Sequence, residues 1–421
     1  MSVPPGSGDK LTREHYNAIG AAMLGWTMDA FDYFIVVLVY ADIAKDFGVS
    51  LTKMAFLTTV TLIMRPVGAF LFGFWADRHG RRIPLLVDVC FYSTVGFLCA
   101  FAPNFSVLLV LRLLYGIGMG GEWGLGASLA MEKIPAKKRG IVSGFLQQGY
   151  AIGYLLAAAV YLVIRNFTDW GWRGLFAFSI VPAIVTLIFR TRVHESELWM
   201  ETSEKAKLTR TRTRDVLLKP TVLRRFGYLI ILMTLFNWLS HGSQDIYPTY
   251  LKEGLHFAPN TALYIAMLYN VGALTGGLIM GALSEKIGRR AVIVLCCALG
   301  LPVIPLFAAS HTLGLVCLGS FLMQVFVQGA WAVVPAHLSE LSPPEIRGFY
   351  PGVTYQLGNC LAAFNLPIQE RLAGSHSYTF AISVTLVPVM VLLAVFAALG
   401  KEARGERLGT SSMQPRESVE V

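Results

Sequence analysis

Residues 73–82 read Gly73-Phe74-Trp75-Ala76-Asp77-Arg78-His79-Gly80-Arg81-Arg82, and the same pattern returns 208 residues later. The second copy is Gly281-Ala282-Leu283-Ser284-Glu285-Lys286-Ile287-Gly288-Arg289-Arg290. Further pairs share this offset without a gap: Gly121 and Gly329, Trp123 and Trp331, Glu132 and Glu340, Arg139 and Arg347, and Gln148 and Gln356. One constant shift predicts two duplicated halves, and parallel repeats of this kind are typical of transporters whose site lies between the halves.

The composition is that of a membrane protein. Hydrophobic residues make up 55% of the 421 residues, charged residues only 14%, and the mean hydropathy is +0.57. Roughly a dozen apolar runs of ~20 residues fit in the sequence, and this is the length that a helix needs to cross ~30 Å of hydrocarbon. We therefore predict an all-α polytopic membrane protein with twelve transmembrane helices in two six-helix halves.

The expected spans follow from the apolar runs. They are residues 17–40, 54–76, 83–102, 106–133, 140–164, 172–190, 226–250, 261–283, 291–310, 313–337, 349–370 and 377–399. The two six-helix bundles are then residues 17–190 and 226–399, joined by a polar and basic linker at 191–225. Residues 1–16 precede the first bundle, and the tail 400–421, rich in Gly, Ser, Glu and Arg, is predicted to be disordered.

The net charge is +9, which in a soluble protein would suggest nucleic acid as a partner. Here the Arg and Lys residues lie in alternate short loops, after spans 2, 4, 8 and 10, whereas the loops after spans 3 and 9 carry none. This asymmetry predicts orientation: both termini and the linker face the cytoplasm, in the cell (inner) membrane. The lipid bilayer is then the expected partner, with no nucleic acid. Two halves in one chain need no second copy to form a pathway, so we expect a functional monomer.

A dense polar cluster, Asn237 to Thr249, lies in a segment that otherwise spans the bilayer. On one helix, Asn237, His241, Gln244 and Pro248 would line a single face, with Ser240 beside them. Ionisable groups in a span normally face a water-filled cavity or a partner, so the cluster predicts a solute site. The alternative is a set of hydrogen bonds that hold helices together.

The offset of 208 residues places Asp29 on Asn237 and Asp32 on Ser240, so the first span carries a matching polar face. Arg65 lies 12 residues before Asp77, or ~18 Å along a helix, which places a fixed cation near the membrane midplane. An arginine keeps its proton and its planar fork suits a carboxylate, so Arg65 is a candidate ligand for a substrate anion. The alternative is a permanent ion pair with Asp29, Asp32 or Glu122.

The predicted spans hold more acids than bases. Two arginines, Arg65 and Arg112, face five acids: Asp29, Asp32, Asp88, Glu122 and Asp245. Full ionisation would leave about three uncompensated negative charges, so at least one acid is predicted to carry a proton during part of a cycle. His241 could titrate near neutral pH, and the alternative is a neutral histidine that only hydrogen-bonds. Among the polar groups of the second half, Gln356 is the best candidate to face a cavity because it repeats Gln148.

The duplicated Gly-x-x-x-(Asp/Glu)-(Arg/Lys)-x-Gly-Arg-Arg motif and the glycine series around Gly116 and Gly120 resemble the major facilitator superfamily over nearly the whole chain. That resemblance implies a tight turn after spans 2 and 8, with charges that latch a cytoplasmic gate. The pairs Glu132-x6-Arg139 and Glu340-x6-Arg347 resemble the sugar-porter pattern that completes such a latch. The implied gating residues are Asp77, Arg78, Arg81, Glu132, Arg139, Glu285, Arg289, Glu340 and Arg347. The alternative is that these are ordinary positive-inside loops.

Within that superfamily, Met28-Asp29-Ala30-Phe31-Asp32 and Asn237-x-x-Ser240-His241-x-Ser243-Gln244-Asp245 resemble the sialate-proton symporter family, and the second pattern is similar to its lactate and pyruvate permeases. The resemblance implies proton-coupled symport of a small monocarboxylate, with protons and a small organic acid anion as partners. The candidate substrate-binding residues are Arg65, Asn237, His241, Gln244 and Gln356, and the candidate proton-coupling residues are Asp29, Asp32, Glu122 and Asp245. Carriers of aromatic acids or sialic acid are the alternative.

An enzyme is not predicted. The sequence has no phosphate-binding glycine loop followed by Lys-Ser/Thr, no His-Glu-x-x-His and no nucleophile elbow. All six cysteines lie in apolar runs, so neither a disulfide framework nor a metal site is predicted, and we expect no cofactor. The alternative from a different class is a membrane-embedded sensor, which would adopt the fold without moving a solute.

Overall fold

The computed structural model describes residues 11–191, 195, 199–201, 203–204, 213–406 and 408, and all regular structure in them is helical. The predicted all-α fold is confirmed. The remainder of the predicted N-terminal segment 1–16, of the linker 191–225 and of the tail 400–421 lies outside the described residues.

The first half begins with one long helix and ends with two short ones. Its α-helices are α1 (Arg13–Leu38), α2 (Tyr40–Phe47), α3 (Leu51–His79), α4 (Arg82–Leu98), α5 (Phe105–Lys133), α6 (Arg139–Phe167), α7 (Gly171–Phe178) and α8 (Ile180–Thr191). Short 3-10 turns, Cys99–Phe101 and Ala136–Lys138, follow α4 and precede α6.

The second half has more interruptions. After α10 (Thr213–Leu217) come α11 (Pro220–Gln244), α12 (Tyr247–Thr249), α13 (Pro259–Ile287), α14 (Arg289–Gly300), α15 (Ile304–Ala308), α16 (Leu313–Trp331), α17 (Val334–Leu341), α18 (Tyr350–Ala362), α19 (Asn365–Ser375) and α20 (Tyr378–Leu399). A π-helix, Tyr250–Gly254, follows α12, and 3-10 turns lie at Leu301–Val303 and Pro344–Ile346. α11 starts at Pro220, inside the predicted linker, because proline suits the first helical position, where no N–H partner is needed.

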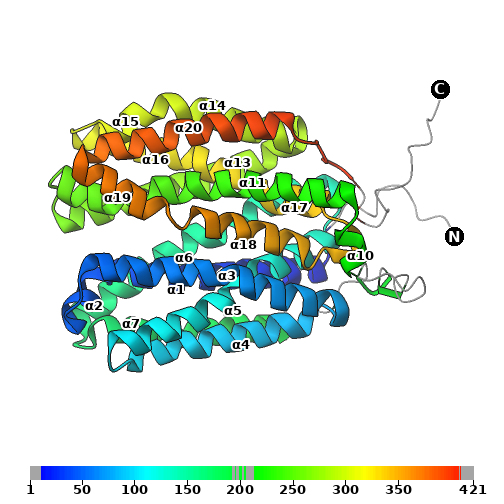
Figure 1. Cartoon of the computed structure of the whole chain (residues 1–421), viewed down its shortest axis with the longest axis horizontal. Coiled ribbons are helices and arrows are strands. Elements are labelled where there is room, and N and C mark those ends of the chain that lie inside the picture. Colours follow the sequence, from blue (N-terminus) through cyan, green and yellow to red (C-terminus); the bar gives the residue numbers. More distant parts are fainter. Residues whose placement is uncertain are drawn as a thin grey trace.

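The helices lie in two layers, α1 to α8 in one and α11 to α20 in the other (Figure 1). Within the layers, α1 packs on α6 and α3 on α5, while α13 packs on α16 and α11 on α18. Between the layers, α6 packs on α13 and α3 on α18. Each layer buries its own apolar core, and the two cores meet around Tyr150.

Both repeats of the glycine motif form a sharp turn between two long helices. Gly80 ends α3 with φ 93°, and Gly288 separates α13 from α14 with φ 101°. These backbone angles lie in a region that glycine adopts without steric cost and that other residues avoid. The two turns lie at the same end of the bundle as α10 and the end of α20 (Figure 1), and we call this the latch end.

Close contact between α3 and α5 fixes the position of Arg65. A Cβ atom added to Gly120 would overlap the backbone carbonyl of Arg65, and one added to Gly116 would overlap that of Thr61. The glycine series of α5 therefore lets the two backbones approach far more closely than larger residues allow. Arg65 is thereby held in the middle of α3, between Ser50, which caps the helix, and Gly80.

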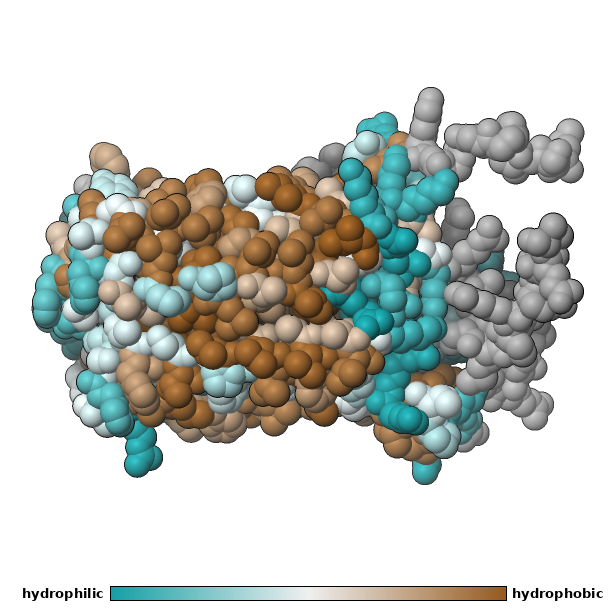
Figure 2. Space-filling view, turned by 90° about the horizontal axis from the view of Figure 1, so that it is seen from above, coloured by the Kyte–Doolittle hydropathy of each residue, from teal (hydrophilic) through white to brown (hydrophobic). Residues whose placement is uncertain are grey.

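The surface matches a membrane protein. Figure 2 shows a broad hydrophobic band around the middle of the molecule, with hydrophilic residues gathered toward both ends. Eleven helical segments of the described chain are long and apolar enough to cross a membrane. The predicted span at 349–370 is the one that fails this criterion, because α18 ends at Ala362 and α19 starts at Asn365. Together α18 and α19 occupy that place in the bundle (Figure 1), consistent with twelve transmembrane segments.

Candidate functional site

A cavity lies between the two halves. Its walls come from α1, α3, α5 and α6 on one side and from α11, α16 and α18 on the other. The residues that line it are Trp26, Asp29, Ala30, Tyr33, Arg65, Met119, Gln147, Tyr150, Asn237, Ser240, His241, Gln328, Trp331 and Tyr355. Four of the predicted site residues are therefore brought together: Asp29, Arg65, Asn237 and His241.

Arg65 and Asp29 form a buried ion pair in the cavity wall. The Arg65 Nη2 atom donates to Asp29 Oδ2 at 2.7 Å, and neither residue is more than 5% exposed. The pairing that the sequence left open as an alternative is thus present in this conformation. Each residue could make a further hydrogen bond, because Arg65 Nε and Asp29 Oδ1 are buried without a hydrogen-bond partner among the described residues.

The polar face of α11 is shorter than predicted. Asn237, Ser240 and His241 line the cavity, but α11 ends at Gln244, and Pro248 belongs to the separate helix α12. Pro248 has no N–H to donate to the carbonyl of Gln244, and its ring clashes with that carbonyl in a continuous helix, so the predicted single face cannot extend to it. The side chain of Asn237 donates to the Met233 carbonyl at 2.8 Å, which leaves its amide oxygen for other partners.

His241 joins a chain of polar groups that extends away from the cavity. Its Nδ1 atom lies 2.9 Å from Asp245 Oδ2, and its Nε2 atom lies 3.0 Å from Asn359 Oδ1. The Asn359 amide is oriented by its own Nδ2 atom, which donates to Gln356 Oε1 at 3.3 Å. Because Asn359 presents an acceptor, His241 Nε2 must carry a hydrogen. A second proton is then needed between Nδ1 and the Asp245 carboxylate, whichever of the two groups holds it.

The remaining predicted residues lie outside the cavity wall. Gln244 accepts from the Tyr150 hydroxyl at 3.1 Å and donates to Gln324 at 3.1 Å, so it orients a residue that does line the cavity. Gln356 acts through Asn359, as described above. Asp32 accepts from the Tyr115 hydroxyl at 3.1 Å.

Arg112 and Glu122, two further charged residues of the predicted spans in the first half, also lie outside the cavity wall. Arg112 donates to the backbone carbonyl of Asp32 at 3.3 Å, and its guanidinium lies over the Tyr115 ring at 4.4 Å. Glu122 is buried on α5, outside the cavity wall. Among the described residues, no group of three or more His, Cys, Asp or Glu could hold a metal ion.

Several cavity residues carry no signal that identifies them in the sequence. Gln147 and Tyr355 sit in stretches rich in apolar residues and glycine, and their orientation depends on contacts between halves. The repeat would have indicated Tyr33, because Tyr33 lies 208 residues before His241 and both line the cavity. Their rings meet edge to face, with centroids 6.3 Å apart. The aromatic wall also includes Trp26 stacked on Tyr150, with ring centroids 5.7 Å apart.

The predicted gating residues meet at the latch end in two related copies. Asp77 accepts from the backbone N–H groups of Gly348 at 2.8 Å and Phe349 at 3.1 Å, both in the opposite half. Glu285, its repeat, accepts from the N–H of Gly140, the repeat of Gly348. These hydrogen bonds join each half to the other through a carboxylate and a backbone amide, a strong type of contact.

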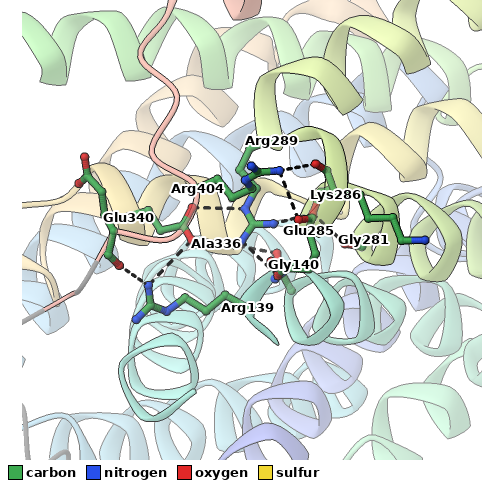
Figure 3. A network of polar contacts seen from close by, with 12 residues as sticks. Arg139, Gly140, Gly281, Glu285, Lys286, Arg289, Ala336, Glu340 and Arg404 are labelled. Atoms are coloured by element: carbon green, nitrogen blue, oxygen red, sulfur yellow. Dashed lines mark hydrogen bonds and ion pairs between the residues drawn. The ribbon is translucent and has the colours of Figure 1, made fainter. Parts of the chain in front are cut away.

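Ion pairs surround both carboxylates. Arg81 pairs with Glu132 at 2.9 Å and lies 3.8 Å from Asp77, and Arg289 pairs with Glu340 at 3.1 Å and with Glu285 at 3.2 Å. Figure 3 shows this second copy from close by, with Arg289 between acidic groups and Arg139 reaching in from the first half. Across the halves, Arg139 lies 3.9 Å from Glu340, and Arg347 lies 3.9 Å from Glu132. Arg78 stacks on Phe74 at 4.0 Å and is outside the network.

The start of the predicted tail is part of this network. Glu402 accepts from the backbone N–H groups of Arg289 at 3.2 Å and Arg290 at 3.0 Å, and Arg139 donates to the Glu406 carbonyl at 2.7 Å. Burial raises the pKa of Glu402, but the N–H groups of Arg290, Arg289 and Arg404 and the interaction with His337 together leave this pKa below its usual value. Residues 400–406 are therefore held against the latch, in contrast to the disorder predicted from their composition.

Known families match both halves of the chain. The description "Sugar (and other) transporter" matches residues 17–225, and "Major Facilitator Superfamily" matches residues 245–419. A carboxylic acid transporter protein homolog of Saccharomyces cerevisiae is 29% identical over 87% of this chain, which spans 63% of that protein's length. The sialic acid transporter NanX of Escherichia coli is 28% identical (91% of this chain, 94% of NanX), and the niacin transporter NiaP of Acinetobacter baylyi is 26% identical (94% and 95%).

Solved structures show the same fold. The proton:xylose symporter XylE bound to 6-bromo-6-deoxy-D-glucose superposes with a TM-score of 0.75 at 20% identity, over 94% of this chain and 98% of that one. The human organic anion transporter MFSD10 gives a TM-score of 0.74 at 15% identity, over 92% and 100%. At these identities the likeness concerns the fold alone.

Proposed function

Because the chain belongs to the major facilitator superfamily, whose members are transporters and not enzymes, we propose that it is a proton-coupled symporter of a small monocarboxylate, with lactate and pyruvate as the first candidates. The observation that carries the proposal is the buried Arg65–Asp29 pair in the wall of a cavity between the halves. A substrate carboxylate and the Asp29 carboxylate compete for one guanidinium. A proton on Asp29 removes its charge and frees Arg65, so anion and proton bind together.

The C-terminal half contributes neutral donors and a second proton-holding group. Asn237, Ser240 and His241 face Arg65 across the cavity, so a bound acid contacts both halves. Gln244 and Gln356 act as orienting residues, through Tyr150 and Asn359. The His241–Asp245 pair, whose Nδ1 and Oδ2 atoms lie 2.9 Å apart, is a further coupling candidate beside Asp29, Asp32 and Glu122.

A ring-bearing acid is the second candidate. Five aromatic side chains line the cavity: Trp26, Tyr33, Tyr150, Trp331 and Tyr355. Such surfaces favour planar substrates through stacking and edge contacts. The relatives named for carboxylic acids, sialic acid and niacin support an organic acid of either kind. We further propose that the latch end is cytoplasmic and that a single chain suffices, since both walls of the cavity come from one chain.

Uptake into vesicles tests this function. Accumulation of labelled lactate should rise as external pH falls below internal pH, and a protonophore should abolish it, because the proton gradient drives the anion inward. Unlabelled pyruvate should compete, and the order among acetate, benzoate, sialic acid and a dicarboxylate identifies the preferred acid. Accumulation that follows a sodium gradient and ignores the protonophore would mean that the buried acids form a cation site.

The latch predicts a different phenotype. Asp77→Ala removes the carboxylate that accepts from Gly348 and Phe349, two contacts of a type typically worth about 1.5–3 kcal/mol each. The conformational equilibrium should shift by at least about tenfold toward the state open at the latch end, so transport falls while substrate binding stays measurable. Glu285→Ala should do the same. Glu253→Ala, an exposed acid away from the latch, is the matched control. Loss of binding in folded Asp77→Ala protein would contradict the gating role.

A further inference from the structure

The helix that forms span 10 is broken between the cavity and the latch. α16 ends at Trp331 and α17 begins at Val334. Before the break, Ala332 N donates to Gln328 O at 3.0 Å, and after it His337 N donates to Val333 O at 2.8 Å. Pro335 has no N–H for the Trp331 carbonyl. The regular bond from Ala336 N to Ala332 O is not made either.

A hydroxyl from the other half takes the place of that bond. Ser143, on α6, donates from its Oγ atom to Ala332 O at 2.6 Å and accepts from Ala336 N at 3.1 Å. Ser143 is fully buried. Ala332 O and Ala336 N are thereby satisfied, as buried backbone groups need to be. The satisfying group belongs to the layer that must move relative to span 10 in any alternating-access cycle.

Proline does not interrupt every described helix in which it occurs. α3 continues through Pro66 and α20 continues through Pro388, each as one helix. The equivalent span of the first half, α5, is also continuous, and Ala127 stands where the second half has Pro335. The hydroxyl of Ser128, the counterpart of Ala336, lies 2.7 Å from two carbonyl oxygens, that of Gly124 in its own helix and that of Arg347 in the other half, and shares its one hydrogen between them. An inserted hydroxyl therefore distinguishes the broken helix from these three continuous ones.

The break connects two functional regions. Trp331, the last residue of α16, lines the cavity, and Glu340 on α17 pairs with Arg289. A change in the angle between α16 and α17 would therefore move the cavity wall and the latch together. Small changes at such a junction are amplified when the element has two discrete arrangements.

We propose that Ser143 is a positioning residue of the transport cycle, whose hydroxyl keeps span 10 broken while the halves are joined at the latch end and whose withdrawal lets Ala336 N bond directly to Ala332 O. In the joined state Ser143 bridges the two groups. In the separated state the helix runs through the proline, as α3 and α20 do, and carries Trp331 with it. The proposal rests on the chain being an alternating-access transporter, and it is independent of which acid is carried.

Spin labels at His79 and Ile287 can measure the opening in the full chain in lipid nanodiscs. These positions are equivalent in the two glycine turns, one in each half, and both are exposed. Ser143→Ala should raise the population with a wide distance by roughly threefold to thirtyfold, the range expected for losing one or two hydrogen bonds between halves. Ser143→Thr keeps the hydroxyl and should retain the parent distribution.

Two further variants separate an inserted bridge from a simple contact between halves. Pro335→Ala supplies the missing N–H, so the helix becomes continuous without help and the latch should open as in Ser143→Ala. In that background Ser143→Ala should add little. Ser128→Ala removes a comparable contact between halves at an unbroken helix and should add its full effect to Pro335→Ala. Additive effects of Ser143→Ala and Pro335→Ala would overturn the proposal.

Hydrogen exchange at the Ala336 amide gives an independent readout. In Ser143→Ala the amide should stay protected, because Ala332 O replaces the hydroxyl as its acceptor. Fast exchange at Ala336 would show that the helix does not close and would overturn the proposal even if the latch opens. Both readouts work without substrate. A failure to transport any monocarboxylate would therefore reject the proposed function and leave the inference on Ser143 to these two measurements.

Discussion

Arg65→Ala is expected to abolish substrate binding, the largest single effect in the cavity. Arg65 is the one arginine or lysine in the described cavity wall, so its removal leaves the substrate carboxylate with neutral donors and His241. It also leaves the Asp29 carboxylate buried without its cation, and a broken buried pair is typically destabilising by about 3–5 kcal/mol. Binding should therefore be measured on protein whose folding is checked by size-exclusion chromatography and thermal unfolding.

Arg65→Lys is the variant that keeps the charge. It loses the two-pronged geometry, which should cost roughly 1.5–3 kcal/mol, or about ten- to more than a hundredfold in affinity. Asn237→Ala removes a neutral partner and should cost only about 0.5–1.5 kcal/mol. Isothermal titration with the preferred acid ranks the three variants. If Arg65→Lys binds as tightly as the parent while Asn237→Ala does not, Arg65 is a structural partner of Asp29 and the carboxylate is held elsewhere.

The fold was predictable because hydropathy and repetition act over long stretches. Each helical span needs a long apolar run, and the gap-free repeat sets the number of spans in each half. Interruptions within spans were less predictable, because they depend on tertiary contacts. Pro66 and Pro388 lie inside continuous helices, whereas the helix is interrupted near Pro335, where Ser143 from another helix bonds to Ala332 O and Ala336 N.

The ionisable residues of the candidate site could be predicted from the sequence, whereas its neutral polar residues could not. Arg65, Asp29 and His241 stand out because ionisable residues are costly in a membrane, and they do line one cavity. Gln147 and Gln328 line it too, whereas Gln356, favoured by the repeat, lies behind Asn359. Amides occur in spans both as helix contacts and as cavity donors, so their sequence pattern does not separate the two roles.

The structure of the tail also could not be predicted from its sequence pattern. Residues 400–406 have the polar composition of a disordered segment, yet Glu402 accepts from the N–H groups at the start of α14. Free N–H groups at a helix start attract a carboxylate from any part of the chain that reaches them. Composition describes the average segment, whereas this contact depends on where α20 ends relative to α14.

Asp29→Asn is expected to separate substrate binding from proton coupling. The amide oxygen of asparagine still accepts from Arg65, but it carries no charge and no titratable proton. The substrate then meets a guanidinium without a competing anion, and binding no longer requires a proton. In the parent, the dissociation constant should rise by about tenfold for each pH unit above the pH at which Asp29 loses its proton, since one proton is bound with each anion. In the variant this dependence should be flat.

Transport by Asp29→Asn follows from the same argument. Exchange of labelled for unlabelled acid across the membrane should persist, whereas accumulation against a gradient should be lost, because the anion crosses without its proton. Asp32→Asn tests the neighbouring coupling candidate, since Asp32 lies one turn further along α1 and accepts from Tyr115 instead of Arg65. If the coupled proton is on Asp29, Asp32→Asn should keep the pH dependence of the parent. Glu253→Gln, at an exposed acid outside the cavity, is the control. If Asp29→Asn retains both the slope and the accumulation, the coupled proton is held elsewhere, and the His241–Asp245 pair becomes the leading candidate.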